Sequence, residues 1–356
     1  MRRSRRLTVR TPGFHPGNRG SIPLGITRVQ LHHMITNKII HTCTTSDLVQ
    51  VENLFQEASV LLWNKPLGKS IKHKLGEPFT YTVENLPRQW PGAFIYLLVN
   101  ENPKALDTCL SLASVWNLFY IHDDIKDEKQ ARYGTKTALS IFGKKVCRVT
   151  LEKALSGMGL KDKVGKNIAD TLGKLDKIQR HRFETPPSDI REYEKQSVSR
   201  LMFIREYWIR AANSVNDIAL AEFIGKSATL EAKTAQLRND LKNVHPREEE
   251  QGGRVYSDFY EGKYTFITLF TLELASPHDR AWIMSNIWKS GQRSDIEGTT
   301  KLRSICESCG AIYKAKTILN QNIERLEEGL KKSGLTNYQK NLWALYLQRT
   351  LRRHSI

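Results

Sequence analysis

The sequence predicts an all-α fold, a bundle of helices whose sites are built from inward-facing side chains on facing helices. Three observations predict it. Apolar residues recur at spacings of three and four over most of the chain after residue 45, as they do on one face of an amphipathic helix. Strand-like alternation is scarce. Proline and glycine pairs, such as Pro186–Pro187 and Gly252–Gly253, fall between the periodic stretches.

The first 33 residues depart from this pattern. They contain seven arginines, no acidic residue and many glycines and prolines, without a helical period. We expect residues 1–33 to be a disordered basic extension. It is either an organellar transit segment or a stretch that precedes a true start at Met34. Residues 34–356 are then expected to form a single all-α domain.

Five stretches of the remaining chain are predicted helices. The first begins at a Ser–Asp pair, which can cap a helix. The second becomes apolar on most faces, as a helix at the centre of a bundle does. Three more follow with the same period. The predicted helices are 46–63, 104–125, 189–215, 230–244 and 310–332.

The chain carries a formal net charge of +18, from 55 basic and 37 acidic residues. This excess indicates an anionic partner, such as nucleic acid, a membrane surface or a phosphorylated small molecule. Because no zinc-finger, RNP-like or basic-zipper pattern accompanies the charge, we expect no nucleic-acid partner. No run reaches the roughly 18 apolar residues of a membrane-spanning helix. Five scattered cysteines make no disulfide framework, so we expect reduced thiols and a cytoplasmic protein.

Three aspartates stand close together at the end of the second predicted helix: Asp123, Asp124 and Asp127. On a helix they share one side, where like charges repel by roughly 0.2–0.5 kcal/mol a pair. A bound cation would offset this repulsion. Such clusters also occur on ordinary charged helix surfaces, and Asp123 with Lys126 is a common i, i+3 pair.

The same spacing, i, i+1 and i+4, recurs in the fourth predicted helix at Asn239, Asp240 and Asn243. Carboxylate and amide oxygens suit hard cations such as Mg²⁺. Mg²⁺ usually binds through one or two carboxylates together with substrate phosphates. The two clusters therefore predict a metal site that is shared with a phosphorylated ligand.

Basic and apolar residues accompany the clusters. The candidates to bind diphosphate oxygens are Arg132, Arg254 and Lys263. Leu118, Phe119 and Tyr120 precede the aspartates and predict an apolar, aromatic pocket. This combination suits a hydrocarbon that carries a diphosphate. Metal-assisted departure of the diphosphate leaves a carbocation, which a dry aromatic pocket stabilises.

Three stretches resemble the trans-isoprenyl diphosphate synthases. HDDIKDEKQARYG, residues 122–134, resembles their first DDxxD motif with its Arg–Gly element. QLRNDLKNVHPREEEQGGRVYSDFYEGKYTF, residues 236–266, resembles their second motif with its lysine loop, and residues 304–330 resemble their C-terminal helices. The likeness runs in order over about residues 50–335. It implies the class I isoprenoid-synthase bundle, both motifs facing one central cavity, three Mg²⁺ ions with an allylic prenyl diphosphate, and a homodimer.

The resemblance also implies roles by position. Metal ligands are Asp123, Asp124 and Asp127 in the first motif, and Asp240 with Asn239, Asn243 and Gln236 in the second. Diphosphate contacts are Arg132, Lys263 and Arg254, the last at a family lysine. In the family, isopentenyl diphosphate has a separate basic site, whose Gly-Lys-x-x-Arg element corresponds here to Gly68, Lys69 and Lys72. Arg200 stands near the family's Lys-Thr-Gly segment.

Two departures fall on that second site. The family's histidine position holds Trp116, and the second arginine of its Arg-Arg-Gly triplet is Tyr133. Neither side chain can supply a bidentate cationic grip. Asn239 also opens the second motif as in terpene cyclases. The sequence therefore favours a terpene synthase, which ionises one allylic diphosphate and lets the cation cyclise or lose a proton.

Two alternatives stay open. One is a chain-elongating prenyltransferase of the farnesyl or geranylgeranyl diphosphate synthase type, whose second site uses Lys69, Lys72 and other basic residues. The other is an inactive partner subunit, against which the three crowded aspartates argue. In either enzyme, Leu118 and Phe119 above the motif suggest a shallow pocket and a ligand of 15 to 20 carbons.

Overall fold

The computed structural model describes residues 45–85, 90–132, 134–157, 163–184, 187–244, 255–288 and 296–348. The chain divides into residues 1–39 and residues 40–356, and all of the described residues belong to the second unit. The predicted extension 1–33 lies outside the described residues, so its disorder and the boundary at Met34 stay predictions. Tyr133 and Arg254 also lie outside them.

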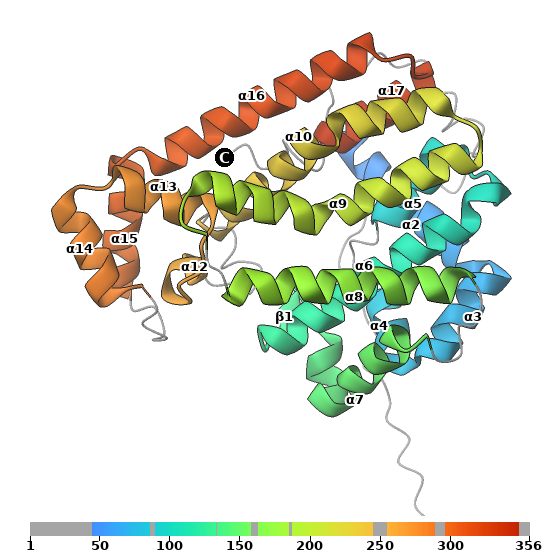
Figure 1. Ribbon diagram of the computed structural model, residues 1–356, viewed down its shortest axis with the longest axis horizontal. Helices are drawn as coiled ribbons and strands as arrows, with labels where there is room; N and C mark the ends of the chain where they lie inside the picture. The colour runs from blue at the N-terminus through green and yellow to red at the C-terminus, as the bar shows by residue number, and fades with distance from the viewer. Residues whose placement is uncertain are drawn as a thin grey trace, which may run out of the picture. The chain divides into compact units, whose positions relative to one another are not determined.

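The predicted all-α fold is confirmed (Figure 1). In the described ranges the strands are β1 (Ala131–Arg132) and β2 (Thr135–Lys136), which pair antiparallel. The helices are α2 (Thr45–Asn64), α3 (Pro66–Leu75), α4 (Glu77–Asn85), α5 (Trp90–Leu98), the 3₁₀ turn η1 (Pro103–Ala105), α6 (Leu106–Lys126), α7 (Ala138–Leu155), α8 (Lys163–Glu184), α9 (Ile190–Ser214), α10 (Ile218–Asn243), α12 (Ser257–Tyr260), α13 (Phe266–Leu274), α14 (Pro277–Asn286), α15 (Ile296–Ser308), α16 (Ala311–Lys332) and α17 (Asn337–Tyr346).

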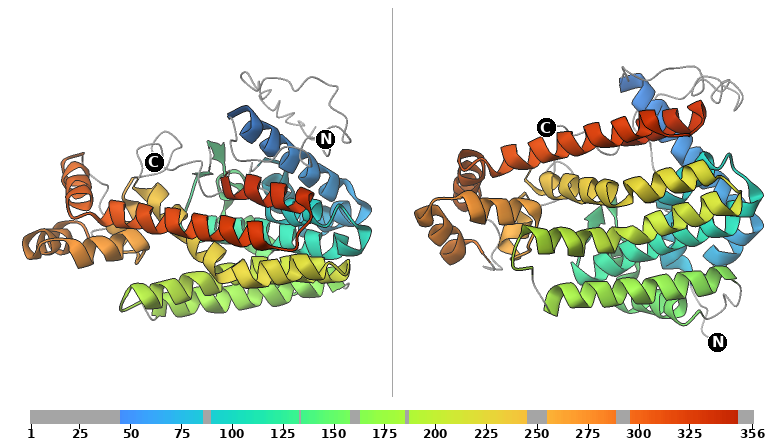
Figure 2. Two further views of the ribbon diagram at one scale, coloured as in Figure 1. Left: turned by 90° about the horizontal axis from the view of Figure 1, so that it is seen from above. Right: turned by 45° about the horizontal axis from the view of Figure 1, so that its top comes forward.

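Helix α6 lies at the centre of the bundle, as its apolar sequence predicts. Nearly every residue between Cys109 and Ile121 is buried. The helix packs against α4, α5, α7, α8 and α9. The long helices α8, α9, α10 and α16 run side by side, each against the next (Figure 2). The two aspartate-bearing helices of the sequence, α6 and α10, therefore belong to one helical body.

Side chains fix where the site-bearing helices begin. Asp189 caps α9 by accepting hydrogen bonds from the backbone N–H groups of Arg191 and Glu192. Asp217 caps α10 through the N–H of Leu220. Thr265 caps α13 in a reciprocal box with Thr268. These caps satisfy N–H groups that have no partner within the helix, and they set the first residues of α9, α10 and α13.

The described part of the chain contains no helix long and apolar enough to cross a membrane. Its cysteines, Cys109, Cys147, Cys306 and Cys309, are free thiols. Cys306 lies on α15 and Cys309 follows the end of that helix, so the pair forms no disulfide.

A buried polar triad ties the C-terminal helix to the bundle. Arg205 of α9 forms an ion pair with Glu231 of α10, and the hydroxyl of Tyr346 on α17 donates a hydrogen bond to the same carboxylate. All three side chains are almost fully buried. Burial lowers the pKa of Arg205 to about 10 and raises the pKa of Tyr346 to about 12, so Arg205 is charged and Tyr346 is neutral at pH 7. The triad is satisfied only as a set.

Glu231→Ala should lower the free energy of unfolding by about 3–5 kcal/mol, because Arg205 would stay buried without its partner. Glu222→Ala on the same helix is the control. Glu222 is 61% exposed and pairs only across one turn with Lys226, so its removal should change stability by less than about 0.5 kcal/mol. Urea unfolding measures both. Equal effects would show that the triad is not held as described.

Candidate active site

The first aspartate cluster lies at the C-terminal end of α6. Asp123 is in the last turn, and Asp127 is the residue that ends the helix. Their side chains are 23% and 36% exposed. The partial negative charge of a helix C-terminus disfavours carboxylates there. The repulsion inferred from the sequence is therefore increased by the helix itself, and a cation is the natural partner of these two groups.

Asp124 lies on the inner side of the same turn. Its carboxylate is buried and accepts a hydrogen bond from the Nε of Arg132. Burial raises the pKa of Asp124 to about 6, although the charge of Arg132 opposes the shift. Arg132 Nη2 is also 4.0 Å from Asp123 Oδ2, and its guanidinium stacks 5.0 Å above the ring of Tyr120.

The turn after α6 explains this arrangement. In it the backbone N–H of Lys129 donates to the carbonyl of Asp124 at 3.0 Å, so the chain reverses and Arg132 of β1 reaches the helix end. Arg132 was predicted to bind diphosphate and Asp124 to bind metal. The structure pairs these two residues with each other, and leaves Asp123 and Asp127 as the partly exposed members of the cluster. The predicted ligand roles of all four stay predictions.

The second cluster on α10 divides in a similar way. Asn239 is exposed, whereas Asp240 is buried. The carboxylate of Asp240 accepts hydrogen bonds from the hydroxyl of Tyr193 (2.8 Å), the backbone N–H of Phe266 (2.9 Å) and the amide of Gln236 (2.6 Å). Two predicted members of the second metal site, Asp240 and Gln236, therefore bind each other and the protein interior.

Asn243 holds the segment that follows α10. Its amide donates to Ser257 Oγ at 2.7 Å, its side-chain oxygen accepts from the N–H of Asp258 at 3.3 Å, and its backbone carbonyl accepts from the N–H of Tyr256 at 2.7 Å. We call residues 255–265 the lysine segment. Asn243 holds its beginning, and Asp240 binds the N–H of Phe266 directly after its end.

The lysine segment brings the two motifs together. Lys263 Nζ lies 3.9 Å from Asp127 Oδ1 of the first motif. It also pairs with Glu261 at 2.5 Å. Burial lowers the pKa of Lys263, but Asp127, Asp258 and Glu261 outweigh burial and the pKa is raised, so the ammonium is charged at neutral pH. The two motifs are more than 100 residues apart in sequence, but these two side chains bring them within 4 Å of each other.

The donor set fits a hard cation that shares its coordination with phosphate. Among the residues that the structure describes, no three His, Cys, Asp or Glu side chains form a group that could hold a metal ion alone. Asp123 and Asp127 supply two carboxylates beside a charged lysine. Mg²⁺ binds in this way when substrate phosphates complete its coordination, whereas a structural zinc site needs a closed set of four protein ligands.

The chain is similar to known prenyl diphosphate synthases. No model of a known protein family matches the chain. A geranylgeranyl pyrophosphate synthase of Dictyostelium discoideum is 27% identical over 247 residues, which cover 63% of this chain and 78% of the relative. The solved structure of a geranylgeranyl pyrophosphate synthase covers 88% of this chain and 100% of its own, with a TM-score of 0.68 at 15% identity. In sequence and in fold, the chain resembles the trans-isoprenyl diphosphate synthases.

A further solved synthase, from Corynebacterium glutamicum, was crystallised with isoprenyl diphosphate and magnesium. It covers 86% of this chain and 98% of its own, with a TM-score of 0.60 at 17% identity. These findings confirm the family resemblance and show that the chain is an isoprenoid synthase, an enzyme.

The favoured terpene-synthase interpretation is wrong, because the relatives and solved structures are chain-elongating prenyl diphosphate synthases. The physical reason is that Trp116 and Tyr133 stand where the family has two cationic or polar side chains, and the loss of these two side chains does not by itself remove a diphosphate site. A strongly basic chain can supply positive charge from other positions. This is the alternative in which Lys69, Lys72 and other basic residues form the second site.

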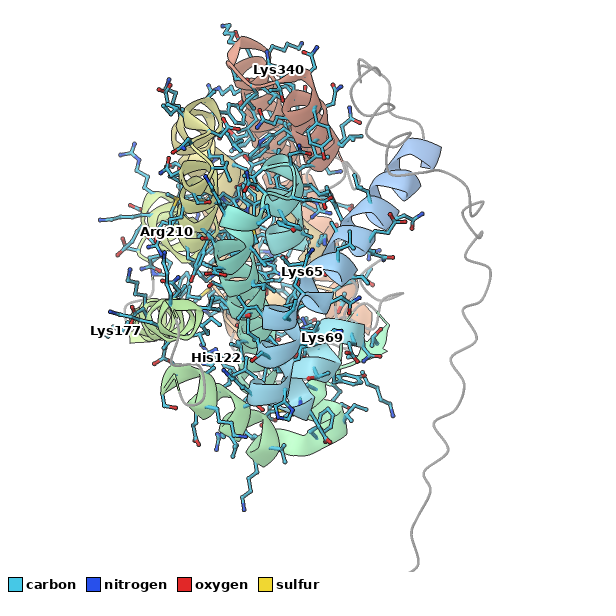
Figure 3. The ribbon with its side chains drawn as sticks, turned by 90° about the vertical axis from the view of Figure 1, so that its right-hand side faces the viewer. Lys65, Lys69, His122, Lys177, Arg210 and Lys340 are labelled. Carbon is cyan, nitrogen blue, oxygen red and sulfur yellow. The ribbon has the colours of Figure 1, made fainter. Side chains whose placement is uncertain are left out.

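In this synthase, the residues carried over from the isopentenyl site lie on α3. Gly68 permits close packing there, since a Cβ would lie 2.8 Å from the carbonyl oxygen of Trp63. Lys72 pairs with Glu84 of α4 at 2.9 Å. Lys69 is exposed and lies on the same side of the molecule as Lys65 (Figure 3). Lys69 is therefore the more accessible of the two predicted lysines.

The predicted pocket residues of the synthase differ in position. Trp116 is half-buried and stacks on Phe119, with ring centroids 6.2 Å apart, and meets the edge of Tyr120 at 5.3 Å. Trp116, Phe119, Tyr120 and Asp123 recur at spacings of three and four, so they share one side of α6. Leu118 is fully buried on another side. The aromatic group therefore continues directly into the first motif.

Sequence reasoning missed Tyr193, the hydroxyl that binds Asp240. It lies 47 positions from Asp240, and only the packing of α9 on α10 brings the two together. Arg200, two turns further along α9, donates from Nη2 to Gln236 Oε1 at 2.7 Å. The placement of Arg200 near the family's Lys-Thr-Gly segment gave a partial signal for this network.

Proposed function

We propose that this synthase is a chain-elongating trans-prenyltransferase, which joins isopentenyl diphosphate to an allylic prenyl diphosphate. In this reaction the allylic carbon–oxygen bond breaks and diphosphate leaves. The double bond of isopentenyl diphosphate forms a new carbon–carbon bond at the same allylic carbon, and one proton is lost. The observation that carries the proposal is the contact of Lys263 with Asp127, because it gives one site both carboxylates and a cation for a diphosphate.

Asp123 and Asp127 on one side, and Asn239 on the other, are the residues that would hold Mg²⁺, with three ions expected from the family resemblance. The ions would neutralise charge on the departing diphosphate. The Corynebacterium synthase crystallised with magnesium and isoprenyl diphosphate supports this assignment.

The protein's own groups then have separate tasks. Lys263 adds positive charge beside Asp127. Arg132 fixes the turn of α6 by binding Asp124, so that Asp123 keeps its orientation. Trp116 and Phe119 offer aromatic faces next to the motif, which exclude water and stabilise a developing carbocation. For isopentenyl diphosphate we propose Lys69 as a binding cation, since Lys72 already has Glu84 as partner.

Purified protein with Mg²⁺, farnesyl diphosphate and isopentenyl diphosphate should release inorganic diphosphate and form a longer prenyl diphosphate. Chelation by EDTA should abolish turnover. Lys69→Ala should raise KM for isopentenyl diphosphate about tenfold, which corresponds to the loss of one charged contact. Lys65→Ala, an exposed lysine on the same side of the molecule (Figure 3), should leave KM unchanged.

The products decide the outcome. Hydrocarbons or alcohols formed from farnesyl diphosphate alone, with isopentenyl diphosphate left unconsumed, would contradict the proposal. No turnover of any allylic diphosphate of 10, 15 or 20 carbons would make the chain an inactive partner subunit. We propose products of 15 to 20 carbons, because Phe119 shares one side of α6 with Asp123 and lies only one turn above it. The homodimer stays a prediction.

A further inference from the structure

Asp240 has a complete set of partners inside the protein. It is only 2% exposed, and its two oxygens accept hydrogen bonds from three donors. A buried carboxylate is stable in its charged form only when such donors surround it. The adjacent Asn239 points to the exposed side of α10. The direction of Asp240 therefore fixes the rotation of α10 about its own axis, and with it the direction of Asn239.

The side-chain amide of Gln236 has one orientation in this network. Its Nε2 donates to Asp240 Oδ1 at 2.6 Å and to the hydroxyl of Tyr193 at 3.2 Å. Its Oε1 consequently faces Arg200, whose Nη2 donates at 2.7 Å. A rotated amide would place donors against donors. One hydroxyl and one amide thus connect α9 with the second motif of α10.

The same carboxylate fixes the end of the lysine segment. Asp240 Oδ2 accepts from the N–H of Phe266, the first residue of α13, where a negative charge is stabilised by the helix dipole. The ring of Tyr193 packs edge-on against Phe266 with centroids 5.0 Å apart. Only two residues separate Phe266 from Lys263, whose carbonyl accepts from Thr268 Oγ1 at 3.0 Å.

We propose that Tyr193 is a positioning residue of the active site. Through Asp240, its hydroxyl sets both the direction of Asn239 on α10 and the place of Lys263 beside Asp127. Tyr193 touches neither metal nor substrate in this scheme. The inference rests on the proposed function for the identity of the substrate, but not for the binding of Mg²⁺ and diphosphate.

Tyr193→Phe tests the inference, because phenylalanine keeps the ring against Phe266 and removes only the hydroxyl. The first measurement is titration calorimetry of inorganic diphosphate with Mg²⁺ present, which needs no turnover. We expect diphosphate binding to weaken about fivefold to tenfold. This loss corresponds to part of the free energy of one charge-assisted hydrogen bond. In steady-state assays kcat should fall and KM for the allylic diphosphate should rise, whereas KM for isopentenyl diphosphate should stay constant.

Tyr207→Phe is the matched control. Tyr207 lies on the same helix, is equally buried, and its hydroxyl bonds to Thr171 Oγ1 and the Asn167 carbonyl, both at 3.0 Å, on α8. This variant loses comparable hydrogen bonds away from the second motif, so it should lose some thermal stability and keep diphosphate binding. Binding losses of equal size in both variants would overturn the positioning role.

Gln236→Leu gives a second test if Tyr193→Phe does not fold. It removes another donor to Asp240 with little change in volume, and it should weaken Mg²⁺-dependent diphosphate binding in the same direction. Unchanged diphosphate binding in either folded variant would overturn the inference. A wild-type protein that binds diphosphate with Mg²⁺ but does not consume isopentenyl diphosphate would contradict the proposed function alone.

Discussion

Asp123→Ala should lower kcat about a thousandfold, as expected when a group that fixes a catalytic charge is removed. The carboxylate of Asp123 is partly exposed at the C-terminal end of α6, where it is electrostatically unfavourable in the folded protein. Its removal should therefore leave stability unchanged or slightly raised. Turnover with Mg²⁺, and thermal unfolding without Mg²⁺, measure the two effects separately.

Asp107→Ala is the control for this experiment. Asp107 lies in the first turn of α6, is exposed, and interacts favourably with the positive end of the same helix. Its loss should cost stability by less than about 1 kcal/mol and leave kcat unchanged. A variant Asp123→Ala that keeps a tenth or more of the wild-type kcat would remove Asp123 from the metal site.

The fold was predictable because its signal is local. Helical periodicity and caps are written within each stretch, and the predicted helices 46–63, 104–125, 189–215 and 310–332 match α2, α6, α9 and α16 within a few residues. The prediction 230–244 found only the second half of α10. Its first half, which begins at Ile218, was not recognised.

The site was predictable in composition but not in geometry. Spacing shows that Asp123 and Asp124 share a turn, but it does not show which of them meets Arg132. That choice depends on the turn between α6 and β1, which brings Arg132 back to the helix. Likewise, spacing alone does not distinguish the roles of Asp240 and Asn243. In the structure Asn243 binds the beginning of the lysine segment, and Asp240 binds the residue directly after its end.

The functional error has a related cause. Trp116 was interpreted as the loss of a histidine that binds isopentenyl diphosphate. A single sequence shows which side chain is missing, but not which other side chain takes over its role. In the structure Trp116 stacks on Phe119 and packs edge-on against Tyr120, and so forms part of the aromatic side of α6 that leads to Asp123. This aromatic packing is compatible with an elongating enzyme.

Arg132→Met should be strongly destabilising, by about 3–5 kcal/mol, because it leaves the buried carboxylate of Asp124 without its ion pair. Arg132 opposes the effect of burial on Asp124 and holds its pKa at about 6. Without this arginine the pKa of Asp124 rises further. Because the carboxyl group of Asp124 is ionised in the unfolded protein at pH 7, this rise lowers the free energy of unfolding. Urea unfolding at pH 7 measures it.

The double variant Asp124→Leu with Arg132→Met separates stability from function. Removing both partners of a buried pair in favour of apolar side chains is often neutral, so the double variant should recover most of the lost stability. It should not recover kcat, because Asp123 would still lack the arginine that faces it at 4.0 Å.

Arg210→Met is the control, since Arg210 is exposed and stacks 5.5 Å above the ring of Tyr207. If Arg132→Met unfolds no more easily than Arg210→Met, the pair with Asp124 contributes nothing to the fold. If the double variant regains wild-type kcat, Arg132 has no part in orienting Asp123, and the turn at the end of α6 holds its shape without it.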